Sequence, residues 1–174
     1  MSSSLQRCAL AVLSIVAICL PAAGSTPASH DVTIPTTDGG IVTVTWTGTS
    51  PAGTAGAGST CVGVGGVSQD EHTVNLTVPA GAYADVSVTA EFRIDWDDQS
   101  GNDLVLSLEQ DGTNIGDSDN SNGPGTSFES IGKSNPTAGA FNAIVCSFAA
   151  IPAQPYTGTL TLKATAKPSG GGGV

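Results

Sequence analysis

Apolar and polar residues alternate along most of this chain, which is the pattern of β-strands that bury one face. The longest such run extends from Val86 to Ile94, and it reaches Trp96 if the strand persists. The pattern predicts about eight short strands in all. The other strands are expected at residues 41–47, 61–67, 73–78, 104–109, 127–131, 139–148 and 156–166.

No segment beyond residue 24 has the 3.6-residue periodicity of a useful helix, and Thr, Val, Ser and Gly are abundant. Short strands separated by turn residues predict an all-β fold, an antiparallel two-sheet β-sandwich of the jelly-roll kind. Its core would form between the two inward faces. The large residues expected there are Trp46, Phe92, Trp96, Leu106, Phe141 and Tyr156.

Residues 1–24 have a different pattern, that of a secretory signal peptide. A polar start with Arg7 precedes the apolar run Cys8–Leu20, and small residues follow up to Gly24. As a helix this run would cover about 20 Å, short of a bilayer core of about 30 Å. We therefore expect a cleaved signal without a transmembrane segment, cut after Gly24 or, as the second choice, after Ala28.

Export places the chain in the periplasm, outside the cell or on its surface. Lipidation at Cys19 is the competing interpretation of this segment, but Ile18 is bulky where a lipoprotein signal has Gly or Ala. Residues 25–40 are polar and dotted with Pro and Gly, which predicts a flexible lead-in. The sandwich domain is expected at 41–167, followed at 168–174 by a Gly-rich tail or linker.

Charge narrows the range of partners. All fifteen acidic residues follow residue 24, whereas Arg7 is one of only five basic residues. The chain from residue 25 onward therefore has a net charge of −11. A surface this acidic repels the phosphates of nucleic acids and anionic lipid headgroups. Nucleic acid is excluded as a partner, and divalent cations are favoured.

Two cysteines, Cys61 and Cys146, remain after the signal peptide. An even pair in an exported chain predicts one disulfide. Two unpaired cysteines, one buried and one in a loop, are the alternative. In the chain-entropy account, closing the loop between Cys61 and Cys146 stabilises the fold by about 4 kcal/mol.

One part of the chain, roughly residues 73–166, resembles the bacterial pre-peptidase C-terminal domain. The resemblance rests on a strand that ends at a Trp, an Asp-Leu-x-Leu strand and an Asp-Gly turn, followed by two further strands. These motifs are Phe92–Trp96, Asn102–Leu108, Asp111-Gly112, Ser127–Ser130 and, as a looser match, Tyr156–Leu162.

The resemblance implies a non-catalytic, jelly-roll-like sandwich of the kind attached to secreted hydrolases. Such domains assist secretion, folding or attachment to substrate, and some relatives bind calcium. Two features depart from the family pattern. Val105 stands where the family has a second Asp, and the pair Cys61 and Cys146 is not a family hallmark.

A candidate calcium (Ca2+) site follows from the densest charge in the chain, the acidic loop at 95–103. Calcium takes six to eight oxygen ligands and tolerates irregular loops. Glu129 would add a carboxylate from a neighbouring strand if the family layout holds. A solvated turn without an ion is the alternative. The candidate ligands are Asp95, Asp97, Asp98, Asn102, Asp103 and Glu129.

Other chemistry is poorly supported. The loop at 117–123 resembles an EF-hand loop but has Asn122 where Gly is needed and Phe128 where Glu is needed. His30 and His72 are expected to be exposed, and neither belongs to a zinc or Ser-His-Asp pattern. The sequence therefore predicts that the chain is not an enzyme.

Three functions are compatible with these observations. The leading hypothesis is an exported, non-catalytic accessory or binding module, stabilised by calcium, that serves an extracellular protein, a polymer or a cell surface. The second is a structural or adhesive subunit that self-associates through exposed strand edges. The third is a carbohydrate-binding module that stacks sugars on Trp46 or Trp96, unless both tryptophans belong to the core.

Overall fold

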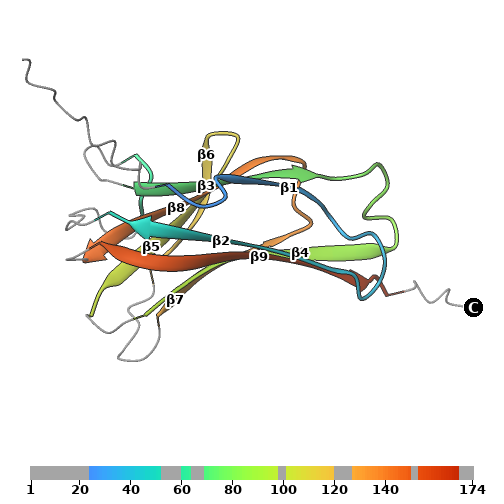
Figure 1. Cartoon of the computed structure of the whole chain (residues 1–174). Coiled ribbons are helices and arrows are strands. Elements are labelled where there is room, and N and C mark those ends of the chain that lie inside the picture. The colour runs from blue at the N-terminus through green and yellow to red at the C-terminus, as the bar shows by residue number, and fades with distance from the viewer. Residues whose placement is uncertain are drawn as a thin grey trace, which may run out of the picture.

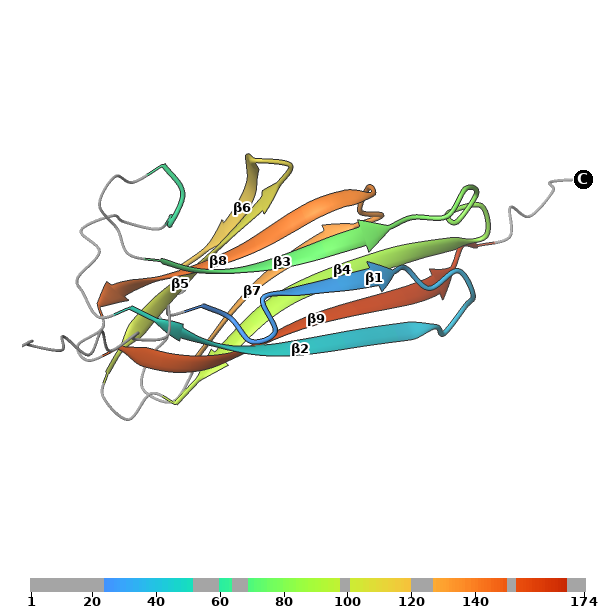
Figure 2. The same cartoon turned by 45° about the horizontal axis from the view of Figure 1, so that its top comes forward.

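The structure is a computed structural model that describes residues 24–51, 60–63, 69–97, 101–119, 127–149 and 153–168. Its described part is all β, with nine strands in two layered sheets (Figures 1 and 2). The prediction of a two-sheet β-sandwich is confirmed. Among the described residues, no helix is long and apolar enough to cross a membrane.

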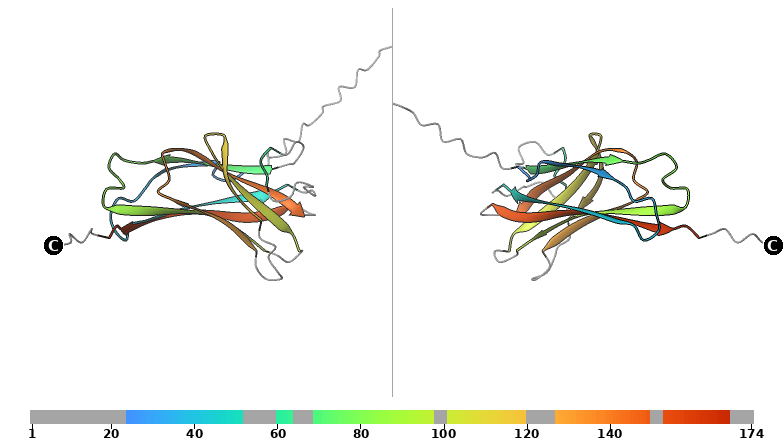
Figure 3. Two further views of the ribbon diagram at one scale, coloured as in Figure 1. Left: turned by 180° about the vertical axis from the view of Figure 1, so that it is seen from behind. Right: turned by 45° about the vertical axis from the view of Figure 1, so that its right-hand side comes forward.

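The five-stranded sheet has the order β1-β3-β8-β5-β6. All of its neighbouring strands are antiparallel except β1 and β3, which run parallel. The two layers are seen from behind and from one side in Figure 3. The strands of this sheet are β1 (Ser29–Thr33), β3 (Gln69–Thr77), β5 (Asp103–Gln110), β6 (Thr113–Ser118) and β8 (Gly139–Ala149).

The four-stranded sheet has the order β2-β9-β4-β7 and is antiparallel throughout. Its central strand β9 pairs with β2 along one side and with β4 along the other. Most outward positions of β2 and β9 are threonine, which fits a sheet that has one face in water. The strands are β2 (Ile41–Ser50), β4 (Val86–Trp96), β7 (Phe128–Ser134) and β9 (Gln154–Ala166).

The core lies between the two sheets, and all six large residues expected there are buried. Phe92 from one sheet and Phe141 from the other stack with ring centroids 5.6 Å apart. Gly158 makes room for Trp46, because a Cβ there would lie 2.0 Å from Cε2 of the indole. Close packing of this kind accounts for a glycine in the middle of a central strand.

A smaller cluster covers the outer face of the five-stranded sheet. Cys61 and Cys146 form a disulfide with a Cα–Cα distance of 5.7 Å, so the predicted pairing is confirmed. The bridge holds the 60–63 segment over Val105 and Ile144, which are buried although they point away from the main core. A second tie is the hydrogen bond from the Cys61 backbone N–H to Ser107 Oγ, at 2.8 Å.

Polar contacts join the two sheets along both of their open sides. On one side, Thr26 and Thr47 exchange backbone hydrogen bonds of 2.7 and 3.0 Å just before the chain enters β1. On the other side, the Ser118 hydroxyl donates to Glu129, and Lys133 donates to the Ile115 carbonyl.

Two strands differ from the sequence prediction. The lead-in at 25–40 was expected to be flexible, but it contains β1. Strand β6 was not expected, and it follows the predicted Asp111-Gly112 turn. Of the weak strand predicted at 61–67, residues 61–63 form a turn and the rest lies outside the described residues.

Candidate functional site

The outer face of the four-stranded sheet carries an ordered set of threonine hydroxyls. Directly opposed residues of β2 and β9 share a face, and three of these pairs are Thr–Thr. Strand β4 continues the same rows with Glu91, Arg93 and Asp95. The three threonine pairs are Thr43 with Thr161, Thr45 with Thr159, and Thr47 with Thr157.

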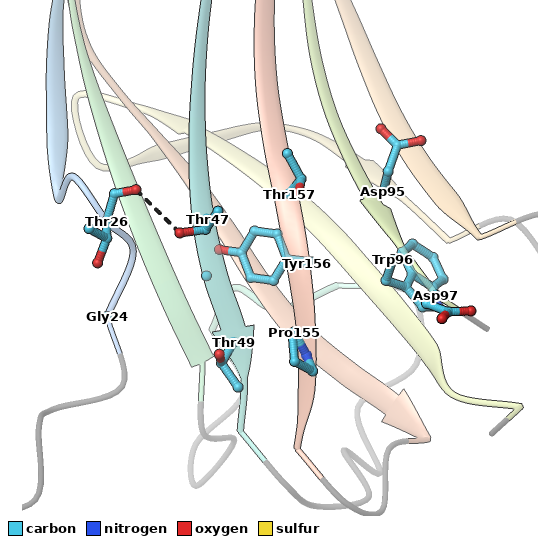
Figure 4. Close-up of a pocket in the computed structure, with 11 residues that line it drawn as sticks. Gly24, Thr26, Thr47, Thr49, Asp95, Trp96, Asp97, Pro155, Tyr156 and Thr157 are labelled. Atoms are coloured by element: carbon cyan, nitrogen blue, oxygen red, sulfur yellow. Dashed lines mark hydrogen bonds between the residues drawn. The ribbon is translucent and has the colours of Figure 1, made fainter. Parts of the chain in front are cut away.

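A groove lies at the end of this face where β2 and β4 end and β9 begins (Figure 4). It has a volume of about 620 Å³ and is open to solvent. The side chains along it are mainly hydroxyls and carboxylates. The residues that line it are Gly24, Thr26, Thr47, Gly48, Thr49, Asp95, Trp96, Asp97, Pro155, Tyr156 and Thr157.

The floor of the groove is fixed by a buried link between the two sheets. The Tyr156 hydroxyl donates to Asp70 Oδ2 at 3.0 Å, and the same oxygen accepts from the Thr49 backbone N–H at 3.0 Å. Burial and the adjacent Asp70 carboxylate raise the pKa of Tyr156, so the phenol keeps its proton. Gly48 is required here because a Cβ would lie 2.3 Å from Asp70 Oδ2.

One wall of the groove is held by an ion pair on β4. The Arg93 guanidinium donates to both oxygens of Asp95, with its shortest contact 2.6 Å from Nη2 to Oδ1. It also lies 3.8 Å from the centroid of the Phe128 ring on the neighbouring strand, a cation–π contact. The hydrogen bonds to Asp95 raise the pKa of Arg93 further above its ordinary value. The Asp95 carboxylate is thus fixed in place at the edge of the groove.

The candidate calcium ligands do not gather into one described site. Asp95 lies on the outer face of its sheet, whereas Glu129 is opposite the buried Ile94 and points into the sandwich. The Asn102 side chain donates to Gln154 Oε1 at 2.7 Å. Asp103 begins β5 in the other sheet.

Asp97 lines the groove beside Asp95, and Asp98 lies outside the described residues. In the described ranges, no group of three or more His, Cys, Asp or Glu residues is placed to hold a metal ion. In the second acidic loop, Asp117 accepts from Ser107 Oγ at 2.6 Å, and residues 120–126 lie outside the described part. Calcium binding by the acidic loop stays a prediction.

Both tryptophans belong to the core. Trp46 is 2% exposed and Trp96 is 8% exposed, so neither offers a ring face to a sugar. The Trp96 indole N–H donates to the Asn102 carbonyl at 3.0 Å and so ties the end of β4 to the start of β5. The hypothesis of sugar stacking on these two rings is wrong.

His72 also departs from the sequence prediction, because its side chain is completely buried. The ring stacks on Trp46 with centroids 4.1 Å apart. Its Nδ1 lies 3.0 Å from the Pro27 carbonyl oxygen and 3.1 Å from Ser25 Oγ, and its Nε2 lies 3.0 Å from His30 Nδ1. The Ser25 hydroxyl donates to the Glu71 carbonyl and is itself buried, so this Ser–His contact is structural.

Comparisons with known proteins add one resemblance. A scan against known protein families finds no match, and a search of curated proteins finds no significant match. Among solved structures, the chain is similar to the pre-peptidase C-terminal domain of collagenase from Bacillus anthracis. The TM-score is 0.39 and the identity is 10%, over 78% of this chain and 94% of that chain. That solved structure belongs to the family that the sequence resembles.

Proposed function

We propose that this protein is an exported, non-catalytic binding module whose groove holds a neutral, hydroxyl-rich ligand such as a polysaccharide segment. The observation that carries the proposal is the open groove lined by the side chains of Thr47, Thr49, Thr157, Asp95 and Asp97.

The donor and acceptor chemistry of the groove supports this ligand class. A threonine hydroxyl both donates and accepts, as a sugar hydroxyl does. Carboxylates accept strong, charge-assisted hydrogen bonds from hydroxyl donors. The volume of about 620 Å³ lies in the usual range of ligand sites. The acidic wall formed by Asp95 and Asp97 disfavours polyanions.

A binding role is favoured over hydrolysis because of how the carboxylates are held. Glycoside hydrolysis uses two carboxyl groups on opposite sides of the bond that breaks. Asp95 and Asp97 both lie on the β4 side of the groove. Both oxygens of Asp95 accept hydrogen bonds from Arg93. This arrangement supports recognition of a ligand.

The test is isothermal titration calorimetry with a panel of soluble neutral polysaccharides and one anionic polysaccharide. We expect binding to one or more neutral polymers and none to the anionic one. Thr157→Val should weaken that binding about tenfold, because it removes a hydroxyl in the groove without changing the side-chain shape; one lost hydrogen bond of about 1.4 kcal/mol corresponds to this factor.

Thr161→Val is the matched control for this experiment. Thr161 lies on the same face of β9 but away from the groove, opposite Thr43. Its substitution should leave the affinity unchanged. An absence of binding to every neutral polymer, or equal losses in the two variants, would count against the proposal.

Self-association is the second candidate, and one observation on β2 favours it. The first five residues of this edge strand, Ile41–Thr45, contain no charge and no proline, the features that protect strand edges. The Thr47 N–H donates to Thr26 and therefore points away from β9. The N–H of Thr43, four residues earlier, points away from β9 too, toward the unpaired edge. Thr43→Pro should abolish any concentration-dependent association seen by sedimentation velocity. A wild-type protein that stays monomeric at high concentration would exclude this candidate.

Calcium stabilisation stays a separate proposal, supported by the composition of the acidic loop alone. The proposed ligands are still Asp95, Asp97, Asp98, Asn102, Asp103 and Glu129, of which Glu129 is buried. A ligand that binds only the folded state raises the melting temperature. We expect a higher melting temperature in millimolar calcium than in chelator. In Asp103→Ala, the melting temperatures in calcium and in chelator should be the same. Equal melts of the wild-type protein would end this proposal.

A further inference from the structure

We propose that signal peptidase cuts this chain between Gly24 and Ser25, and that residues 25–28 are a working part of the folded domain rather than a disposable leader. The inference rests on the export proposed above. It goes beyond it by choosing between two cleavage positions that the sequence leaves open, after Gly24 and after Ala28.

The first observation is the placement of Ser25 and Thr26. Ser25 is only 6% exposed, although it follows the exposed Gly24 directly. Its hydroxyl donates to the Glu71 carbonyl of β3 at 2.9 Å. Thr26 exchanges two backbone hydrogen bonds with Thr47 of β2. These two residues therefore tie one sheet to the other.

The second observation concerns Pro27 and Ala28. The Pro27 carbonyl lies 3.0 Å from Nδ1 of the fully buried His72, and the Ala28 carbonyl accepts from the Thr73 N–H at 3.2 Å. A cut after Ala28 would remove both carbonyls together with the Ser25 hydroxyl. The buried Nδ1–H of His72 would then lose its two neighbours, and an unpaired buried donor is strongly disfavoured.

A cut after Gly24 removes none of these contacts. Small residues precede this bond, in the run Ala22-Ala23-Gly24. Because Ser25 is buried in the folded domain, we expect cleavage to occur before the domain folds.

The first experiment expresses the full chain in a bacterial host that exports proteins by signal peptides. N-terminal sequencing and intact mass are measured on the protein recovered outside the cytoplasm. A product that begins at Ser25 is the expected result. A product that begins at Ser29 would overturn this inference and leave export intact. A chain that keeps Met1 and stays in the cytoplasm would overturn export itself.

The second experiment compares two chains released from a cleavable fusion, one beginning at Ser25 and one at Ser29. We expect the shorter chain to melt roughly 5–10 °C lower, since it loses several buried hydrogen bonds. Thr26→Ala in the longer chain is the control, because its side chain is exposed and its backbone bonds remain. Equal melting temperatures for the two starts would show that residues 25–28 add nothing to the fold.

Discussion

At the scale of single residues, His72 lies in a fully buried site where both ring nitrogens have a polar neighbour and the ring stacks on Trp46. A carbonyl oxygen only accepts hydrogen bonds, so the contact with Pro27 assigns the proton to Nδ1. Nε2 is then the acceptor, and His30 Nδ1–H donates to it. A second proton on His72 would sit on Nε2 and face the Nδ1–H of His30, so the hydrogen bond between the two rings would be lost. Burial, with the neighbouring His30, lowers the pKa of His72 to about 4.

This environment predicts acid sensitivity. Between pH 6.5 and 4 the unfolded chain protonates His72 but the folded chain does not, so stability falls as the pH falls through this window. This pKa shift would contribute about 3 kcal/mol to the free energy of unfolding at neutral pH. In His72→Gln, the free energy of unfolding measured with urea should fall less between pH 7 and pH 4 than it does in the wild-type protein. Thr45→Val, an exposed change without a titratable group, is the control and should keep the wild-type slope. Parallel curves for wild type and His72→Gln would contradict the prediction.

A second residue-scale prediction concerns Gly158. An alanine Cβ at this position would lie 2.0–2.3 Å from atoms of the Trp46 indole, so the ring or β9 must move. We expect Gly158→Ala to lower the free energy of unfolding by at least about 1–3 kcal/mol, the cost of overpacking a core. Gly132→Ala is the matched control in the same sheet, because its Cβ would meet nothing. Similar losses in the two variants would mean that contact with Trp46 is not the cause.

At the scale of elements, the disulfide carries a prediction about the small outer cluster. Replacing both Cys61 and Cys146 with alanine removes the closure of the chain between them, which is worth about 4 kcal/mol in the chain-entropy account. The 60–63 segment should also lose its hold on Val105 and Ile144. We expect faster hydrogen exchange of the backbone amides around Val105 in β5 and Ile144 in β8, measured by mass spectrometry. Unchanged stability and exchange would show that the segment is held without the bridge.

The strands that the sequence predicts well are those with a clean alternation. Strand β4 buries every second residue along its whole length, and the prediction from Val86 to Trp96 matches it. Strand β1 has no such signal, because Val32 is its only buried apolar residue and tertiary pairing with β3 makes it a strand. Strand β6 lacks an apolar alternation too, and the hairpin turn at Asp111-Gly112 brings it beside β5. Alternation of apolar and polar residues therefore does not predict short edge strands that bury few side chains.

At the scale of the whole molecule, the candidate site depends on which strands are neighbours. The alternating threonines of β2 and β9 are visible in the sequence, but their cross-strand pairing is not, because more than one hundred residues separate Thr47 from Thr157. The sequence also does not show how Glu129 lies relative to the acidic loop. Glu129 of β7 pairs with Ile94 and not with Asp95, and neighbouring residues of a strand point to opposite faces, so Asp95 and Glu129 lie on opposite faces of the sheet.

The length of β9 has a mechanical consequence. This strand begins at the groove and ends at Ala166, near the end of the molecule marked C (Figure 1), about 40 Å away at the usual rise per residue. A pull on a ligand in the groove, resisted at the other end, would act along the axis of β9. Ten paired positions with β2 and eleven with β4 would carry that load together, in shear. The two ladders beside β9 would therefore resist such a pull together.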